Sequence, residues 1–143
     1  MKNQKMFNLL ASYYAFYVKL HSYHWNVEGA NFVSIHELLE KQYDVIADEV
    51  DEIAEQIRKL GEKVEASLTN FAKNSIVLEP NEKLSAKEML LDLLNDNKKI
   101  VVYLKELMSI FDGDETLIGT KNLLDGLLET REKDIWFLEM MTK

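Results

Sequence analysis

The chain has 143 residues, of which 47% are hydrophobic and 29% charged, and its formal net charge is −8. This length suits a single domain over residues 1–143 with a sizeable core. The absence of cysteine excludes disulfides and thiolate metal sites, so we expect a cytoplasmic protein. The acidic balance disfavours tight nucleic-acid binding, which depends on Lys and Arg neutralising phosphates. No apolar run approaches the ~18 residues of a membrane span, so no membrane association is expected.

Two long helices are predicted in the first half of the chain. Apolar residues repeat at spacings of three and four over residues 4–27 and again over residues 34–60. Gly29 ends the first helix, and Gly61 can adopt the left-handed conformation that closes the second. Because the connection between them is short, the two helices should form an antiparallel hairpin.

Two Ser-x-x-Glu pairs have the spacing of a capping box, in which the serine hydroxyl and the glutamate carboxylate satisfy backbone amides at a helix start. Ser34 and Glu37 form the first pair, at the start of the second helix. Ser85 and Glu88 form the second pair, which predicts a third helix that runs to about Phe111.

The remaining segments define the topology. The chain between the second and third helices is polar and irregular, with one short helix predicted at residues 67–73 and a break at Pro80. A connection of this length suggests a crossover between the two ends of a bundle. A fourth helix should begin at Asp114 or Thr116. The sequence therefore predicts an all-α four-helix bundle with a long crossover that contains a short helix, which is the ferritin-like topology.

One sector of the second helix carries metal-ligand residues: His36, Glu40, Asp44, Asp51 and Glu55. This sector is rotated by about 130° from the apolar face, so it faces solvent or another molecule. His36 and Glu55 are separated by roughly 28 Å at about 1.5 Å per residue, whereas a metal needs its ligands within about 2–2.6 Å. One helix cannot bring both ends of the sector to one ion, but two antiparallel copies can.

The usual di-iron motif of a bundle core, Glu-x-x-His, is missing. His21, His24 and His36 are preceded three residues earlier by Val18, His21 and Val33. A ligand set of imidazole and carboxylate groups suits Fe(II), Mn(II) or Zn(II). Because most of these ligand atoms are oxygens, the set favours iron that is oxidised to Fe(III). The metal-ligand residues that remain are His24, His36, Glu40, Asp51 and Glu55.

Each of these residues also has a purely structural interpretation. His24 can be a hydrogen-bonded core residue, and His36 a solvated residue of a first helical turn. Asp51 and Glu55 can form a solvated face that pairs with Arg58. The metal-site hypothesis therefore depends on the joint pattern.

The first half of the chain resembles the Dps family of mini-ferritins, in the stretches LHSYHWNVEGANFVSIHELLEKQYD and DEVDEIAEQIRKLGE. The shared pattern is His-Trp-Asn-Val-x-Gly, Asn-Phe, Leu/Ile-His-Glu, then Asp-Glu-Ile-Ala-Glu-x-Ile and Leu-Gly. The resemblance is thinner in the second half, where EKDIWFLEMM is similar to the family's closing helix. It implies a hollow dodecamer of four-helix subunits that oxidises Fe(II), typically with hydrogen peroxide, and stores the ferric mineral.

The resemblance also implies a ferroxidase site at a two-fold interface between subunits. The residues that it implies are His24 and His36 of one subunit and Asp51 and Glu55 of the other. Glu40 stands where some members carry an acidic ligand to a second metal. Trp25 adjoins the site and is a candidate electron donor, or alternatively an interface aromatic.

We therefore expect an iron-storing ferroxidase that protects against oxidative stress, works as a homo-oligomer of twelve subunits and uses hydrogen peroxide or dioxygen. One alternative is a DNA-compacting protein with little iron chemistry, and another is a structural bundle with a vestigial site. Many family members have a tail rich in Lys and Arg, whereas only Lys2, Lys5 and Lys143 flank the helices here. DNA binding is therefore expected to be weak or absent.

Overall fold

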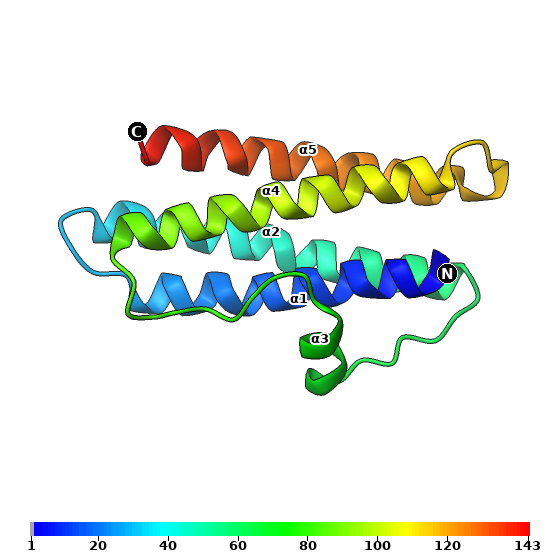
Figure 1. Cartoon of the computed structure of the whole chain (residues 1–143), viewed down its shortest axis with the longest axis horizontal. Helices are drawn as coiled ribbons and strands as arrows, with labels where there is room; N and C mark the ends of the chain where they lie inside the picture. Colours follow the sequence, from blue (N-terminus) through cyan, green and yellow to red (C-terminus); the bar gives the residue numbers. More distant parts are fainter. Residues whose placement is uncertain (1) are drawn as a thin grey trace.

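The computed structural model describes residues 2–143, and the side chains of residues 3–143. The helices are α1 (Lys2–Asn26), α2 (Phe32–Lys59), α3 (Leu68–Asn74), α4 (Ala86–Phe111), the 3-10 helix η1 (Glu115–Leu117) and α5 (Ile118–Met141). The chain forms two antiparallel hairpins, α1 with α2 and α4 with α5, which lie against each other (Figure 1). The described residues contain no strand. The prediction of an all-α four-helix bundle with one crossover is confirmed.

The crossover between α2 and α4 runs along the outside of α1 and carries the short helix α3 (Figure 1). The Ser67 hydroxyl begins α3 by accepting a hydrogen bond from the backbone N–H of Asn70, at 3.1 Å. The Phe71 ring then stacks on Tyr14 and Phe7 of α1, with centroid distances of 4.7 and 5.9 Å. The cap fixes where the short helix starts, and the aromatic contacts attach the crossover to the bundle.

Only one of the two predicted capping boxes forms. Ser85 Oγ accepts from the Glu88 N–H at 3.2 Å, and Glu88 Oε1 accepts from the Ser85 N–H at 2.9 Å. The prediction for Ser34 is wrong, because α2 begins two residues earlier, at Phe32. Ser34 therefore lies inside the first turn, where its hydroxyl donates to the backbone carbonyl of Asn31 at 3.0 Å.

Glycines close the predicted helices where a left-handed backbone is needed. Gly29 follows α1 with a φ of 119°, and Gly61 follows α2 with a φ of 96°. The start predicted for the fourth helix needs a correction. Asp114 caps η1 by accepting from the Thr116 N–H at 3.0 Å, and the α-helix itself begins only at Ile118. One turn of 3-10 helix thus precedes α5.

The core follows the apolar stripes of the four long helices. Fully buried side chains from these helices include Leu9, Phe16, Leu39, Ile46, Ile53, Leu93, Ile100, Leu104, Leu124 and Leu138. Burial of such side chains contributes about 1.5–3 kcal/mol each before conformational entropy is subtracted. Within the described part of the chain, no helix is both long and apolar enough to cross a membrane.

Two cations are also buried in the bundle, Lys19 of α1 and Arg131 of α5, with 1% and 0% of their surface exposed. Lys19 Nζ lies 2.8 Å from Asp96 and 3.0 Å from Asp92, both on α4. The Tyr23 hydroxyl donates to the same Asp92 carboxylate at 2.6 Å. Paired in this way, a buried charge holds neighbouring helices in register.

Candidate metal centre

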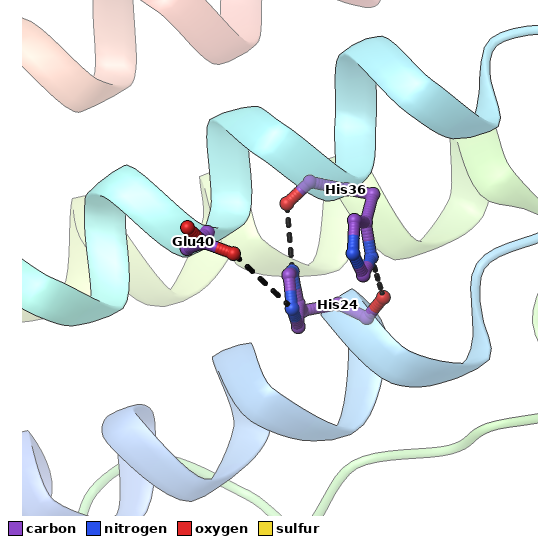
Figure 2. A group of neighbouring side chains, drawn as sticks. All are labelled: His24, His36 and Glu40. Carbon is purple, nitrogen blue, oxygen red and sulfur yellow. Dashed lines mark hydrogen bonds and ion pairs between the residues drawn. The ribbon is translucent and has the colours of Figure 1, made fainter.

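Two histidines face each other across the seam between α1 and α2. Their rings stack with a centroid distance of 3.7 Å and an interplanar angle of 12° (Figure 2). His24, near the end of α1, is 4% exposed, whereas His36 in the second turn of α2 is half-buried. The hairpin turn at Gly29 brings these two helix ends together. The expected pairing of His24 with His36 is therefore present within one subunit.

Reciprocal hydrogen bonds fix both rings. The Nδ1 of His24 lies 2.7 Å from the backbone carbonyl of His36, and the Nδ1 of His36 lies 2.7 Å from that of His24 (Figure 2). A carbonyl oxygen can only accept, so each Nδ1 carries the proton and donates it. In neutral rings, both Nε2 atoms then keep free lone pairs. This is the arrangement in which a protein prepares histidines to bind a metal.

Glu40 completes a group of three ligand-type residues. It lies one helical turn after His36, and its Oε1 is 3.9 Å from Nε2 of His24. One donor atom from each of the three residues lies within 4.8 Å of the others. The Glu40 side chain is exposed, so the group is open to solvent on this side. No other group of three or more such residues is gathered in residues 3–143.

Asp51 and Glu55 lie further along α2, on its exposed surface. At about 1.5 Å per residue, Asp51 is roughly 22 Å from His36, so the subunit does not bring these carboxylates to the histidines. Both carboxylates are exposed, as the alternative of a solvated face predicts, but neither makes an ion pair with Arg58 or Lys59 in the described part of the chain. Asp51 borders a shallow apolar groove formed by α1, α2 and the crossover.

Aromatic rings surround the histidine pair. Phe32 stacks on the outer face of His36 at 4.9 Å, and Tyr43 meets His24 edge-on at 5.1 Å. The third histidine, His21, lies 4.1 Å from Tyr43, and burial together with the nearby His24 lowers its pKa. Sequence reasoning missed Phe32, Tyr43 and His21 as part of the site. Helical spacing was the available signal, since His21 precedes His24 by one turn and Tyr43 follows His36 by two.

Trp25 occupies the outer edge of this aromatic group. Its side chain is 68% exposed and stacks on His21 at 5.0 Å with an interplanar angle of 10°. Within residues 3–143, the Trp25 ring contacts His21 but not His24 or His36 themselves. Trp25 is therefore linked to the ligand pair through His21 and Tyr43, and its exposed face is free in the isolated subunit.

Comparison with known proteins places the chain in a family. The model of the ferritin-like domain matches residues 4–143. The "DNA protection during starvation protein" of Brevibacillus brevis is 33% identical over 132 residues, covering 91% of this chain and 87% of that protein. A Dps crystal structure from Bacillus brevis superposes with a TM-score of 0.95 at 30% identity, over 99% of this chain and 95% of that one. A Vibrio cholerae Dps, described as a member of the ferritin-like diiron-carboxylate superfamily, has a TM-score of 0.93 at 25% identity and coverages of 99% and 89%.

The fold and the match over almost the whole chain define a ferritin-like protein. Within that class, the curated relatives and the superposed structures show that the chain belongs to the Dps family. The resemblance seen in the first half of the sequence is thus confirmed, and it extends through the second half.

Proposed function

We propose that this protein binds Fe(II) at a site shared between two subunits, oxidises it with hydrogen peroxide or dioxygen, and stores the ferric product inside a hollow shell of twelve subunits. The histidine pair is the observation that carries the proposal. Backbone hydrogen bonds fix both rings, the Nε2 of His24 lies 3.9 Å from the Glu40 carboxylate, and one ring nitrogen of His36 lies within 4.8 Å of both, at an edge that is open to solvent. A site of this kind accepts a metal without rearranging its own ligands.

The incompleteness of the group supports a shared site. Two imidazoles and one exposed carboxylate leave coordination positions of a bound metal open. Asp51 and Glu55 of the same subunit lie too far from His36 along α2 to fill these positions. A second copy of α2 packed antiparallel would bring its Asp51–Glu55 end beside His36. A two-fold interface is self-complementary, so it would create two equivalent sites. Each site would then have both nitrogen and carboxylate ligands, which suits iron in both oxidation states.

The chemistry assigned to the site is a two-electron reduction of the oxidant. With hydrogen peroxide, two Fe(II) and two protons give two Fe(III) and two water molecules, so no hydroxyl radical is released. The open edge at Glu40 gives the oxidant and the iron access to the histidines. Removing Fe(II) and peroxide together protects the cell against oxidative stress.

Trp25 has a supporting role in this proposal. When only one Fe(II) is present, the second electron for peroxide must come from elsewhere, and an exposed indole next to the site is a suitable donor. The ring contacts of Trp25 with His21, and of His21 with Tyr43, provide an aromatic connection toward His24. A role as an aromatic residue of the subunit interface accounts for the exposure of Trp25 equally well.

DNA compaction is the second candidate function, and the names of several relatives, "DNA protection during starvation protein", favour it. The charge of this chain argues against it, because a net charge of −8 leaves little counterion release to drive binding to phosphates. A third candidate, a structural bundle with a vestigial site, would leave the orientation of the two histidines without a purpose.

Anaerobic titration with Fe(II), followed by addition of hydrogen peroxide, tests the proposal. We expect saturation at a fixed number of Fe(II) per subunit and consumption of one peroxide for every two Fe(II). The double variant His24→Ala/His36→Ala should lose the rapid phase, while Glu37→Ala, which removes an exposed carboxylate of α2 outside the group of three, serves as the control. Equal rates of oxidation in the double variant and the wild type would rule out this site.

A further inference from the structure

Arg131 lies at the centre of the bundle with a side chain that is 0% exposed. Its Nη2 is 2.9 Å from Oδ2 of Asp134 and 3.3 Å from Oε1 of Glu49, and its Nη1 donates to Oδ1 of Asn97 at 2.9 Å. The three acceptors come from α5, α2 and α4. One guanidinium thus gathers oxygen donors from three helices.

The fourth long helix contributes Tyr13 of α1. The guanidinium carbon of Arg131 lies 5.7 Å from the centre of the Tyr13 ring. The Tyr13 hydroxyl is fully buried and has no hydrogen-bond partner among the described residues, and the same is true of Nε of Arg131. Burial raises the pKa of Tyr13, and the Glu49 and Asp134 carboxylates add to that rise. The Tyr13 hydroxyl is thus a buried polar group whose oxygen is not used by any hydrogen bond.

The donors around Arg131 are of the type that binds hard divalent cations. They comprise two carboxylates, an amide oxygen and a phenol oxygen, all supplied by the four long helices. Bundle proteins of the di-iron class build their metal sites in this central position from inward-facing carboxylates. Here the two carboxylates face one guanidinium, so the position of a metal cation is taken by a side chain with a single positive charge.

We propose that Arg131 is a fixed internal cation, which fills an oxygen-donor set at the centre of the bundle and thereby excludes divalent metal ions from it. The guanidinium contacts both carboxylates directly, so a metal ion could reach them only by displacing the Arg131 side chain. The inference concerns the bundle interior and goes beyond the proposed function, so it holds whether or not His24 and His36 take part in iron oxidation.

A groove of about 380 Å³ between α2 and α5 reaches the cluster from outside at Glu49. Glu49 lines this groove together with Asp48, Glu52, Asn122 and Thr130. A cation drawn to these acidic side chains would meet the Glu49 carboxylate first. In the wild type it would then meet the guanidinium, and like charges repel at such short range. The exclusion is therefore electrostatic as well as steric.

Replacing Arg131 by Ala should expose the hidden site. The substitution leaves Glu49 and Asp134 without a countercharge, and burial already raises the pKa of both groups, Glu49 to about 7, so the variant must either protonate them or lose stability. A divalent cation restores the charge balance, so the variant should gain stability from metal that the parent does not gain. All variants carry His24→Ala/His36→Ala, which removes the histidine edge as a competing site.

The probe is Mn²⁺, and the measurements are the thermal midpoint by circular dichroism and the amount of bound Mn²⁺ by electron paramagnetic resonance. In EDTA, Arg131→Ala should unfold well below the parent. Millimolar Mn²⁺ should raise its midpoint by several degrees and add one bound ion per subunit. The parent, which carries only His24→Ala/His36→Ala, should show neither effect because it keeps the guanidinium. The control Arg131→Ala/Glu49→Gln/Asp134→Asn should show neither effect because it lacks the carboxylates.

Arg131→Ala that folds but shows no shift with Mn²⁺ and no additional bound ion would overturn the proposal, and Arg131 would then be a structural ion pair only. If Arg131→Ala does not fold in EDTA, it is refolded from denaturant with and without Mn²⁺. The proposal predicts recovery of the helical signal only with Mn²⁺. If the helical signal of Arg131→Ala returns in neither condition while the control Arg131→Ala/Glu49→Gln/Asp134→Asn folds normally, the proposal is contradicted as well.

Discussion

His24 and His36 each donate an Nδ1 hydrogen bond to the backbone carbonyl of the other, and both bonds are 2.7 Å long. Because the acceptors are backbone atoms, replacing one side chain does not remove the hydrogen bond that orients the other ring. The two histidines are thus positioned by the α1–α2 hairpin itself. Each remains a fixed ligand when its neighbour is lost.

This relationship gives a prediction for single substitutions. His24→Ala and His36→Ala should each weaken Fe(II) binding by more than the roughly 10–100-fold that loss of a supporting partner causes, because each removes a ligand itself. Helix content should stay unchanged, since the remaining ring keeps its hydrogen bond. Anaerobic calorimetry with Fe(II) measures the affinities, with Glu37→Ala, an exposed residue of α2 outside the group of three, as control. Wild-type affinity in either variant would contradict the assignment of ligands.

The two Ser-x-x-Glu pairs provide a matched test of capping. Ser85→Ala should lower the free energy of unfolding by about 1 kcal/mol per subunit, because Ser85 caps α4. Ser34→Ala should change it much less, since Ser34 is exposed and lies within the first turn of α2. Chemical denaturation at one protein concentration compares the two. Equal losses would mean that α2 starts at Ser34 after all.

The α4 cap also predicts a pH dependence. Hydrogen bonds from Ser85 lower the pKa of Glu88 below its ordinary value of 4.5. A carboxylate with a lowered pKa in the folded state stabilises the protein above pH 4.5 and loses that contribution as the pH falls through the folded-state pKa. The stability difference between wild type and Glu88→Ala should therefore shrink on acidification. Glu37→Ala, from the box that does not form, is the control.

DNA binding should be weak or absent at physiological salt. The chain carries 17 basic and 25 acidic residues, so its net charge of −8 opposes association with phosphates. A gel shift with plasmid DNA at about 0.15 M salt and without divalent ions measures direct binding of the protein to DNA. Retardation under these conditions would contradict the prediction. Binding that requires Mg²⁺ would instead indicate a cation bridge between acidic protein and phosphate.

The helices followed from the sequence because periodicity and caps are local signals. Ser85 and Glu88 occur in an apolar repeat that starts directly after them, and the structure agrees. Ser34 and Glu37 have the same spacing, but Phe32 adds an earlier turn through its ring contact with His36. That contact depends on the tertiary structure, so the local pattern placed the start of α2 two residues too late. The 3-10 helix η1 before α5 was not predicted, although its cap at Asp114 is a local one.

The metal centre was predictable in its residues but only partly in its geometry. Helical spacing placed Glu40 beside His36, and the hairpin brought His24 to them. The reciprocal hydrogen bonds depend on exact backbone positions and give no sequence signal. The cluster around Arg131 could not be predicted from the sequence. Its members Glu49, Asn97 and Asp134 are far apart in the chain, and the residues next to each in the sequence are typical of an exposed helix face.

The central claim is that each site combines His24 and His36 of one subunit with Asp51 and Glu55 of its partner, and subunit mixing tests it most directly. Two variants are needed, His24→Ala/His36→Ala and Asp51→Ala/Glu55→Ala, and each alone should lose rapid Fe(II) oxidation. In a mixed dimer, one interface site lacks all four ligands and the other has all four. After co-refolding, with mixed dimers verified by mass spectrometry, the account predicts about half of the wild-type initial rate per dimer. Mixed dimers with no recovered activity would contradict the shared site and the residue roles that depend on it.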